Sequence, residues 1–469
     1  MSKIALWSIL IGGTGIRVLF LFQPIALDEA TTYVYYASQP LPLALSDYSA
    51  PNNHLFHTLL VHLVTRFGSE EWIIRLPAFL AGIAIIPATY AVGKRLYSEN
   101  AGLLAAVLVA ASSALIEYST NARGYTLVTL FTLLLILTAT SLLERESRRL
   151  WGLFVILSAL GFYTIPTMLY PFVSIAVWLG LIFVARRKKQ QLFSLLSAGS
   201  ATAALTLLLY LPVFVRSGAE AVIGNVFVQP LAWQDFTRAL SDALARTWQL
   251  WNQDFPFFLQ MILLGGVVIA LLAHRRTSQF PIPLFAVALL VSALLVLVGQ
   301  VAPFARVWLW LLPLYLLTAS AGMIWVIRCL RLASAFIPVM AVLLCAGICA
   351  NVAIVRGEKP FGDVAIEPDA ENVVLFLREH IPPEADYTVV PVSAPLVYYF
   401  IQHGLPLSYL GGDLSQVNTE HLIVVVLEPD YTLETLLNLM QQYGLNVEPY
   451  SHRIRLAQFD TASLWELTR

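Results

Sequence analysis

The chain has 469 residues, of which 58% are hydrophobic and 12% charged, and its mean hydropathy is +0.74. Soluble domains carry roughly 25% charged residues, so this composition excludes an ordinary soluble protein and indicates one that crosses a membrane many times. The formal net charge of -1 argues against nucleic acid as a partner, because nucleic-acid binding needs a basic surface.

Apolar runs long enough to cross a bilayer core of about 30 Å recur over residues 1–355. We predict about eleven spans, near residues 4–24, 73–93, 101–119, 125–143, 151–165, 167–185, 191–214, 256–273, 281–300, 304–327 and 333–355. Basic residues cluster at 94–95, 148–149, 186–189 and 275–276. The positive-inside rule assigns these clusters and the N-terminus to the cytoplasm. An odd number of spans then leaves the C-terminus outside.

Residues 356–469 have the pattern of a separate extracytoplasmic unit. Helix-like stretches at 370–380, 396–403 and 433–443 alternate with apolar runs suited to strands at 387–392, 421–427 and 454–459. This order is typical of a small α/β domain. The predicted fold is therefore mainly α: a polytopic helical bundle over residues 1–355, followed by a small α/β domain.

The first outer loop, residues 25–72, opens on the acidic pair Asp28 and Glu29 directly after the first span. A carboxylate pair there can face a water-filled pocket while contacting a lipid-soluble substrate, or it can consist of two solvated acids at the membrane boundary. Asn52 and His54 precede apolar residues at helical spacing between 55 and 67. This pattern predicts an amphipathic helix in the membrane interface. The helix would act as a lid over the acidic pair or as a connector resting on the membrane.

Further polar groups belong to the same face. Glu117, Arg123 and Tyr125 lie in or beside the short connection between the third and fourth spans, where polar groups are costly unless they line water or a polar ligand. Alternatively, Glu117 and Arg123 pair with each other at the interface. Arg17 lies inside the first span and must find a partner such as Glu117 or a phosphate, or else snorkel outward. Tyr163 and Arg306 mark two outer turns, where they are candidate ligand contacts or simple interface anchors.

This combination of groups suits a particular chemistry. Carboxylates can accept a proton from a hydroxyl, and the planar fork of arginine matches phosphate oxygens. The outer face therefore favours a reaction in which a hydroxyl is deprotonated and a phosphate departs.

The order of motifs resembles that of the GT-C glycosyltransferases. The resemblance rests on Asp28-Glu29, Pro51-Asn52-Asn53-His54, Arg75-Leu76-Pro77, Gly93-Lys94-Arg95-Leu96-Tyr97, Tyr118 with Ala122-Arg123-Gly124-Tyr125, and Gly161-Phe162-Tyr163-Thr164. More closely, the order of motifs resembles that of bacterial members of the protein O-mannosyltransferase and aminoarabinose-transferase type. The resemblance covers about the first 170 residues well and the later spans loosely.

The resemblance implies an inverting glycosyltransferase of the bacterial inner membrane. The donor would be a polyprenyl-phosphate sugar, and the extracytoplasmic acceptor a protein, a lipid or a cell-envelope glycan. Asp28 would be the catalytic base, and Glu29 would hold it in place or ligate Mg²⁺ or Mn²⁺. The remaining candidates are Arg123, Arg306, Arg17, Tyr125 and Tyr163 for the donor and its phosphate, and Asn52, His54 and Glu117 for the acceptor or the lid.

The chain departs from the family in its first loop. Relatives often show His-Pro-Pro-Leu where this chain has Pro51-Asn52-Asn53-His54-Leu55. This departure leaves open whether His54 joins Glu29 at a metal.

Two other functions compete with sugar transfer. A transporter or flippase of lipid-linked saccharides would also need outer arginines and an amphipathic lid. Transporters usually place polar groups near the membrane midplane and repeat their halves, whereas we find no internal repeat here. The second competing function is that of a structural subunit in an envelope assembly complex.

Overall fold

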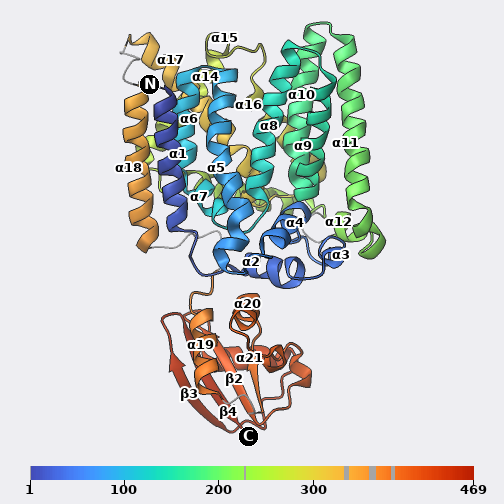
Figure 1. The fold of residues 1–469 in the computed structure, drawn as a ribbon, viewed down its shortest axis with the longest axis vertical. Coiled ribbons are helices and arrows are strands. Elements are labelled where there is room, and N and C mark those ends of the chain that lie inside the picture. The colour runs from blue at the N-terminus through green and yellow to red at the C-terminus, as the bar shows by residue number, and fades with distance from the viewer. Residues whose placement is uncertain (1, 226–228, 332–336, 359–365, 382–385) are drawn as a thin grey trace.

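The computed structural model describes residues 2–225, 229–331, 337–358, 366–381 and 386–469. These residues form a long helical bundle with a small sheet domain at one end (Figure 1). The N-terminus and the basic helix α15 (His274–Thr277) lie at the opposite end of the bundle from the sheet domain.

Over the described residues, each predicted span corresponds to a helix or a broken helix. They are α1 (Ser2–Leu19), α5 (Glu71–Leu96), α6 (Glu99–Ala111) with α7 (Ser113–Ser119), α8 (Tyr125–Glu144), α9 (Arg148–Thr164), η2 (Pro166–Met168) with α10 (Leu169–Ala185), α11 (Lys189–Arg216), α14 (Phe257–Leu272), α16 (Leu284–Gly299), η3 (Ala305–Trp310) with α17 (Leu312–Cys329), and α18 (Ile337–Glu358). Among the described helices, six are long and apolar enough to cross a membrane, or up to eight if each of two bent pairs is one span. The number of spans therefore stays a prediction.

Two places correct the predicted spans. The third predicted span is broken, because α6 and α7 meet at 61°. The predicted loop between α11 and α14 contains α12 (Glu220–Ile223) and an amphipathic helix, α13 (Trp233–Asn252), which meets α14 at 108°. The turns predicted near residues 163–166 and 300–303 are confirmed, since α9 ends at Thr164 and α16 ends at Gly299.

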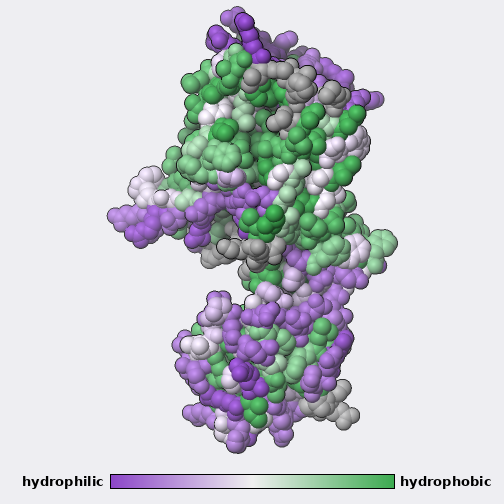
Figure 2. Space-filling model, turned by 90° about the vertical axis from the view of Figure 1, so that its left-hand side faces the viewer, coloured by the Kyte–Doolittle hydropathy of each residue, from purple (hydrophilic) through white to green (hydrophobic). Residues whose placement is uncertain are grey.

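The outside of the bundle is apolar, as a membrane-spanning surface requires. Leu207, Leu272, Leu290 and Val298 are more than half exposed. In Figure 2 hydrophobic residues cover much of the bundle, while hydrophilic residues gather at its upper end and over the sheet domain. Inside the bundle, α14 and α17 cross at Gly266 and Gly322, where a Cβ on Gly322 would collide with the Gly266 backbone. Small residues of this kind let membrane helices pack closely.

The first outer loop folds back against the lower end of the bundle (Figure 1). It contains α2 (Leu27–Thr32), the π-helical turn η1 (Tyr33–Ala37), α3 (Leu41–Ala44) and α4 (Leu55–Val64). The predicted amphipathic helix is α4, which ends three residues before Phe67.

The C-terminal domain has one sheet between helices. Its elements are α19 (Ala370–His380), β1 (Tyr387–Val390), α20 (Ala394–Gln402), η5 (Leu407–Tyr409), η6 (Leu414–Gln416), β2 (His421–Leu427), α21 (Leu433–Gln442), β3 (His452–Gln458) and β4 (Ala462–Thr468). The strand order is β1-β2-β4-β3, with β1 and β2 parallel and the other pairs antiparallel. Helices α19 and α20 share a core with one face of the sheet, and α21 shares a core with the other.

This domain differs from the prediction in two details. The predicted boundary at 355/356 falls inside the last turn of α18, which ends at Glu358. Strand β4 was not predicted, although it lies between β2 and β3 in the sheet.

Candidate functional site

The two acidic residues lie in the first turn of α2 but have opposite environments. The Glu29 side chain is fully buried and that of Asp28 is 43% exposed. Successive helical residues point about 100° apart, so one carboxylate faces the protein and the other faces outward. Of the two carboxylates, only that of Asp28 is accessible from outside the protein.

Glu29 is saturated by hydrogen bonds. Its Oε1 accepts from Arg75 Nε at 2.8 Å and from the Ala122 amide at 2.6 Å. Its Oε2 accepts from Arg75 Nη2 at 2.7 Å and from the Ala26 amide at 2.9 Å. Because a carboxylate has about four lone-pair positions, this set fills it. Glu29 therefore joins α2, α5 and the segment before α8.

Arg75 completes this buried ion pair. Besides Glu29, it donates to the carbonyl oxygens of Leu21 at 2.8 Å, Gln23 at 2.7 Å and Pro24 at 3.0 Å. Sequence reasoning noted Arg75 only as part of a motif and missed this role. The signal was a lone arginine near the start of an apolar span, which requires a buried acidic or carbonyl partner.

Asp28 pairs with Arg123 at the open side of α2. The Arg123 Nη1 atom lies 2.8 Å from Asp28 Oδ2, and the Arg123 side chain is only 5% exposed. Arg123 also donates to Asn52 Oδ1, and Asn52 Nδ2 donates to the Asp28 carbonyl oxygen at 3.1 Å. Arg123 Nε is buried without a hydrogen-bond partner among the described residues. One N–H of this guanidinium is therefore not used by the described residues.

His54 lies beside this pair and is held in its neutral form. Its Nδ1 accepts a hydrogen bond from the Gly124 amide at 3.0 Å, which assigns the ring proton to Nε2. Burial, followed by the charge of Arg123, lowers the pKa of His54 well below 6.5. A Cβ on Gly124 would lie 3.2 Å from His54 Cβ and would collide with Thr164, so the close approach of this loop requires glycine.

Tyr125 connects two guanidiniums. Its hydroxyl accepts a hydrogen bond from Arg306 Nε at 3.1 Å, and the Arg123 guanidinium lies 5.7 Å from the centre of its ring. The rings of His54 and Tyr118 pack edge-on against Tyr125, at 5.2 and 5.4 Å between centroids. Arg123 and Arg306, which are far apart in sequence, are therefore brought to one cluster.

Three predicted residues lie elsewhere. Arg17 is fully buried and donates to the carbonyl oxygens of Gly13 at 2.7 Å and Ala110 at 2.8 Å, and to Ser119 at 3.1 Å. It therefore satisfies backbone carbonyls at the end of α6, beside the bend, and its expected phosphate contact is corrected to a structural role.

Tyr163 packs against Tyr210 of α11, with ring centroids 5.8 Å apart. Glu117 Oε2 accepts from Gln253 Nε2 at 3.1 Å, in the bend between α13 and α14. Arg17 and Arg123, the two arginines considered as partners of Glu117, bond to the Ala110 carbonyl oxygen and to Asp28. Tyr163 and Glu117 therefore belong to the packing around the site.

The residues suggested for a metal do not fit one. The lone pairs of Glu29 are filled by N–H donors, two of them from a guanidinium. His54 Nδ1 is occupied by the Gly124 amide, and its other nitrogen carries the proton. A ligand needs a free lone pair directed at the ion. Glu29 and His54 therefore cannot ligate Mg²⁺ or Mn²⁺ in this arrangement, and no step is derived through a metal.

An apolar cavity of about 400 Å³ lies next to the Arg306 segment. It is formed by α13, α16 and η3 and includes Trp248, Trp251 and Trp308. Leu244 and Leu297, which line it, are partly exposed on the apolar surface of the bundle. Trp308, which lines the cavity, follows Arg306 by two positions in the chain.

Comparisons with known proteins agree with this architecture. Residues 52–215 match the family model of the dolichyl-phosphate-mannose-protein mannosyltransferases. ArnT from Cupriavidus metallidurans in the apo state is similar to the chain with a TM-score of 0.57 and 12% identity, over 96% of this chain and 95% of that one. The same enzyme bound to undecaprenyl phosphate gives a TM-score of 0.57 and 13% identity, over 99% and 96%. No curated protein sequence matches the chain.

At 12–13% identity these structures show the fold, and the family model supports it over the part that includes Asn52, His54 and Arg123. The chain therefore has the fold of ArnT, and residues 52–215 match the mannosyltransferase family model. The resemblance inferred from the motifs is thereby confirmed.

Proposed function

Starting from the GT-C fold, we propose that the chain transfers a sugar from a polyprenyl phosphate to an acceptor on the extracytoplasmic side of the bacterial inner membrane. The observation that carries the proposal is the exposed Asp28 carboxylate, which lies 2.8 Å from Arg123 beside the Arg306 cluster. A base and two phosphate-binding groups thus share one site.

The donor lipid is supported by two observations. The apolar cavity could hold part of a lipid tail, and one of its lining residues, Trp308, is two positions from Arg306 in the chain. The structurally similar ArnT binds undecaprenyl phosphate. A lipid whose phosphate meets the arginines while its tail remains in an apolar environment satisfies both ends of the site.

The reaction is a displacement at the anomeric carbon. Asp28 accepts the proton of the acceptor nucleophile, whose electron pair forms the new bond to the anomeric carbon. The bond between that carbon and the phosphate oxygen breaks, and the electron pair leaves with polyprenyl phosphate. Attack from the face opposite the leaving group inverts the configuration. Phosphate needs no general acid, and Arg123 and Arg306 stabilise its charge.

Glu29 has a supporting role in this mechanism. Its ion pair with Arg75 fixes the first turn of α2, so that Asp28 projects into the site without rearrangement. Asn52 holds both the Asp28 backbone and Arg123, which makes the loop before α4 part of the site. The proposal therefore assigns proton transfer to Asp28 alone.

The direct experiment supplies the purified protein in nanodiscs with a radiolabelled polyprenyl-phosphate sugar and candidate acceptors. Transfer predicts that label moves covalently to an acceptor and that unlabelled polyprenyl phosphate accumulates. A parallel assay in sealed vesicles tests the rival function, because a transporter or flippase would move the intact labelled lipid between the two leaflets. Label that changes leaflet without leaving the lipid would overturn the proposal in favour of transport.

A further inference from the structure

The C-terminal domain contacts the chain directly before the acidic pair. Ala26 and Ile366 form an antiparallel backbone bridge. The hydroxyl of Tyr399, in α20, accepts a hydrogen bond from the Ile25 amide at 3.2 Å. Residues 25 and 26 are therefore held by two separate parts of the C-terminal domain, only two to three positions before Asp28.

Helix α20 lies against the bundle over a wider contact. Tyr398 donates its hydroxyl hydrogen to the Ser69 carbonyl oxygen at 2.7 Å, and Gln402 bonds to the same oxygen. The ring of Tyr398 packs edge-on against Tyr33, at 5.6 Å between centroids. Burial and the nearby charge of Glu71, in the first turn of α5, raise the pKa of Tyr399. Both tyrosines are almost fully buried in this contact.

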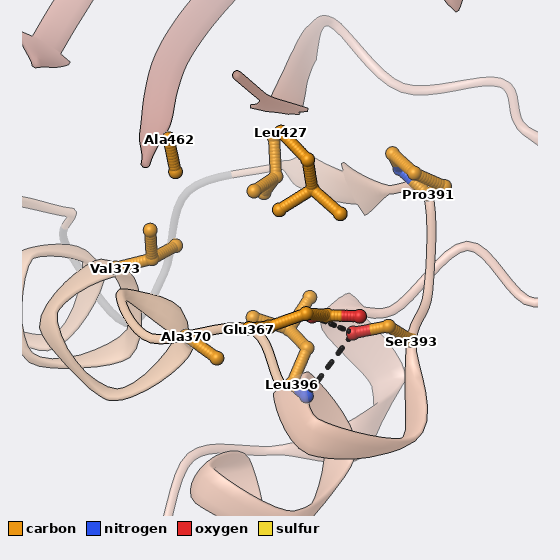
Figure 3. A pocket seen from close by; sticks show the side chains of 9 residues that line it. Glu367, Ala370, Val373, Pro391, Ser393, Leu396, Leu427 and Ala462 are labelled. Carbon is orange, nitrogen blue, oxygen red and sulfur yellow. Dashed lines mark hydrogen bonds between the residues drawn. The ribbon is translucent and has the colours of Figure 1, made fainter. Parts of the chain in front are cut away.

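The two points of attachment belong to one corner of the domain. Ser393 caps α20, accepting from the Leu396 amide at 3.3 Å, and donates to Glu367 at 2.6 Å. Figure 3 shows Glu367 and Ser393 pointing toward one another across the start of α20. Because Glu367 follows Ile366 directly, the bridge to Ala26 and the α20 contact are tied together.

The bundle holds the same segment from its other side. Arg75 binds the carbonyl oxygens of residues 21, 23 and 24, and the Ala26 amide donates to Glu29. The segment that leads into Asp28 therefore has its polar backbone groups shared between the bundle and the C-terminal domain. Removing the domain side would leave the buried Ile25 amide unpaired and free the backbone at Ala26.

We propose that the C-terminal domain is a positioning element of the transfer site, in which Tyr399 acts through Ile25 to keep Asp28 in place. This inference rests on the proposed function. A domain that serves only to recruit an acceptor would not need hydrogen bonds to the residues that precede α2.

The test compares two tyrosine-to-phenylalanine variants in the full-length protein. Tyr399→Phe keeps the ring and removes the hydroxyl that contacts Ile25. Tyr450→Phe is the matched control, because the Tyr450 hydroxyl is also buried and donates to the Thr419 carbonyl oxygen at 3.0 Å within the C-terminal domain. The two variants differ mainly in whether the lost bond reaches the bundle.

The first readout is hydrogen exchange of peptides covering residues 21–33, which needs no activity. In Tyr399→Phe, the amides of residues 21–33 are expected to exchange about fivefold faster than in the wild type. The amides of β2 and β4 should stay as protected as in the wild type. Tyr450→Phe is expected to leave residues 21–33 unchanged. If exchange stays at the wild-type rate in Tyr399→Phe, the double variant Tyr398→Phe/Tyr399→Phe removes both hydroxyls, and wild-type exchange in that protein overturns the inference.

The second readout is steady-state transfer. Tyr399→Phe should lower kcat about three- to tenfold and leave KM for the donor within about twofold, because the base moves while the phosphate contacts remain. An acceptor-recruiting domain would instead raise KM for the acceptor at unchanged kcat, which would overturn the inference. If the wild type transfers no sugar, the proposed function fails, and hydrogen exchange still decides whether the domain holds residues 25–29.

Discussion

Asp28 and Glu29 are neighbours in sequence with different roles, and they respond differently to loss of charge. Asp28→Asn keeps the size of the side chain, so donor binding should persist, while transfer should fall by about 10²–10⁴ because no base accepts the proton. Turnover of donor-loaded protein in nanodiscs measures this. Near-wild-type turnover would move the assignment of the base to another residue.

Glu29→Gln provides the contrast. It leaves Arg75 as a buried, unpaired charge, and breaking such a pair costs roughly 3–5 kcal/mol of stability. Reduced thermal stability of the purified variant is expected, whereas Asp28→Asn should lower the melting temperature less, because Asp28 is 43% exposed and Arg123 keeps its bond to Asn52. Equal melting temperatures for the two variants would contradict the assigned roles.

The two arginines are predicted to bind phosphate. Arg123→Ala and Arg306→Ala should each weaken donor binding by about 1.5–3 kcal/mol, the usual contribution of a charge-assisted contact. Arg306→Lys should recover only part of the loss, since an ammonium cannot form the planar fork. Titration with a polyprenyl-phosphate sugar measures binding directly. Arg238→Ala, on the exposed face of α13, is the control, and normal binding by both active-site alanine variants would make the arginines interface anchors.

At the scale of single elements, the helices were easier to predict from the sequence than the contacts between elements. Long apolar runs identified the helices of the bundle, and the spacing of Leu55, Leu59 and Leu63 identified α4, because burial in lipid or at an interface leaves a local signature. The bend at Ser112 has no such signature, since it depends on Arg17 reaching the carbonyl oxygen of Ala110 across 93 positions. Strand β4 was missed because Trp465 and Glu466 interrupt its apolar alternation, and its place is fixed by pairing with β2.

Glu367 gives a prediction for the corner that anchors α20. Burial raises the pKa of this carboxyl above its usual value, while the bond from Ser393 opposes the shift. A raised pKa in the folded state favours the protonated form, so stability from this group is present below the ordinary pKa and is lost as the pH rises through the folded value.

Glu367→Gln stays neutral and should make the C-terminal domain more stable than the wild type at pH 7. The difference should vanish near pH 4, below the ordinary pKa of glutamate of about 4.3. Hydrogen exchange of β1 and β2 in the full-length protein at both pH values measures it. Glu448→Gln, at an exposed position, is the control. A variant less stable than the wild type at pH 7 would contradict the burial argument.

For the whole molecule, the sequence located the site better than it explained it. Asp28, Asn52, His54, Arg123, Tyr125 and Arg306 were all predicted on one face, and the structure gathers them. Arg75 was left without a role and the docking of α20 was not foreseen, because both depend on contacts between segments more than 40 residues apart. Polarity in an apolar sequence marks where chemistry is possible, whereas tertiary contacts decide which carboxylate remains available.

The orientation of the molecule in the membrane is predicted from its basic segments and is open to test. In a variant lacking the three native cysteines, single cysteines at Lys188 and Arg276 should react with an impermeant maleimide only after the membrane is opened. Cysteines at Gln234 and Asn446 should react in intact spheroplasts. All four positions are exposed, so lack of reaction is not explained by burial. Labelling of Asn446 only after opening the membrane would place the C-terminal domain in the cytoplasm.

The cavity between α13, α16 and η3 is lined in part by leucines that are exposed on the surface of the bundle, which suits entry of a lipid from the bilayer. A donor that arrives by that route diffuses in two dimensions, so the enzyme responds to its density in the bilayer and not to its amount per volume of solution. Diluting proteoliposomes with buffer should therefore leave the rate per enzyme unchanged. Adding inert phospholipid at constant donor should slow the reaction in proportion to the donor's mole fraction. A rate that follows bulk concentration instead would mean that the donor reaches the arginines through water.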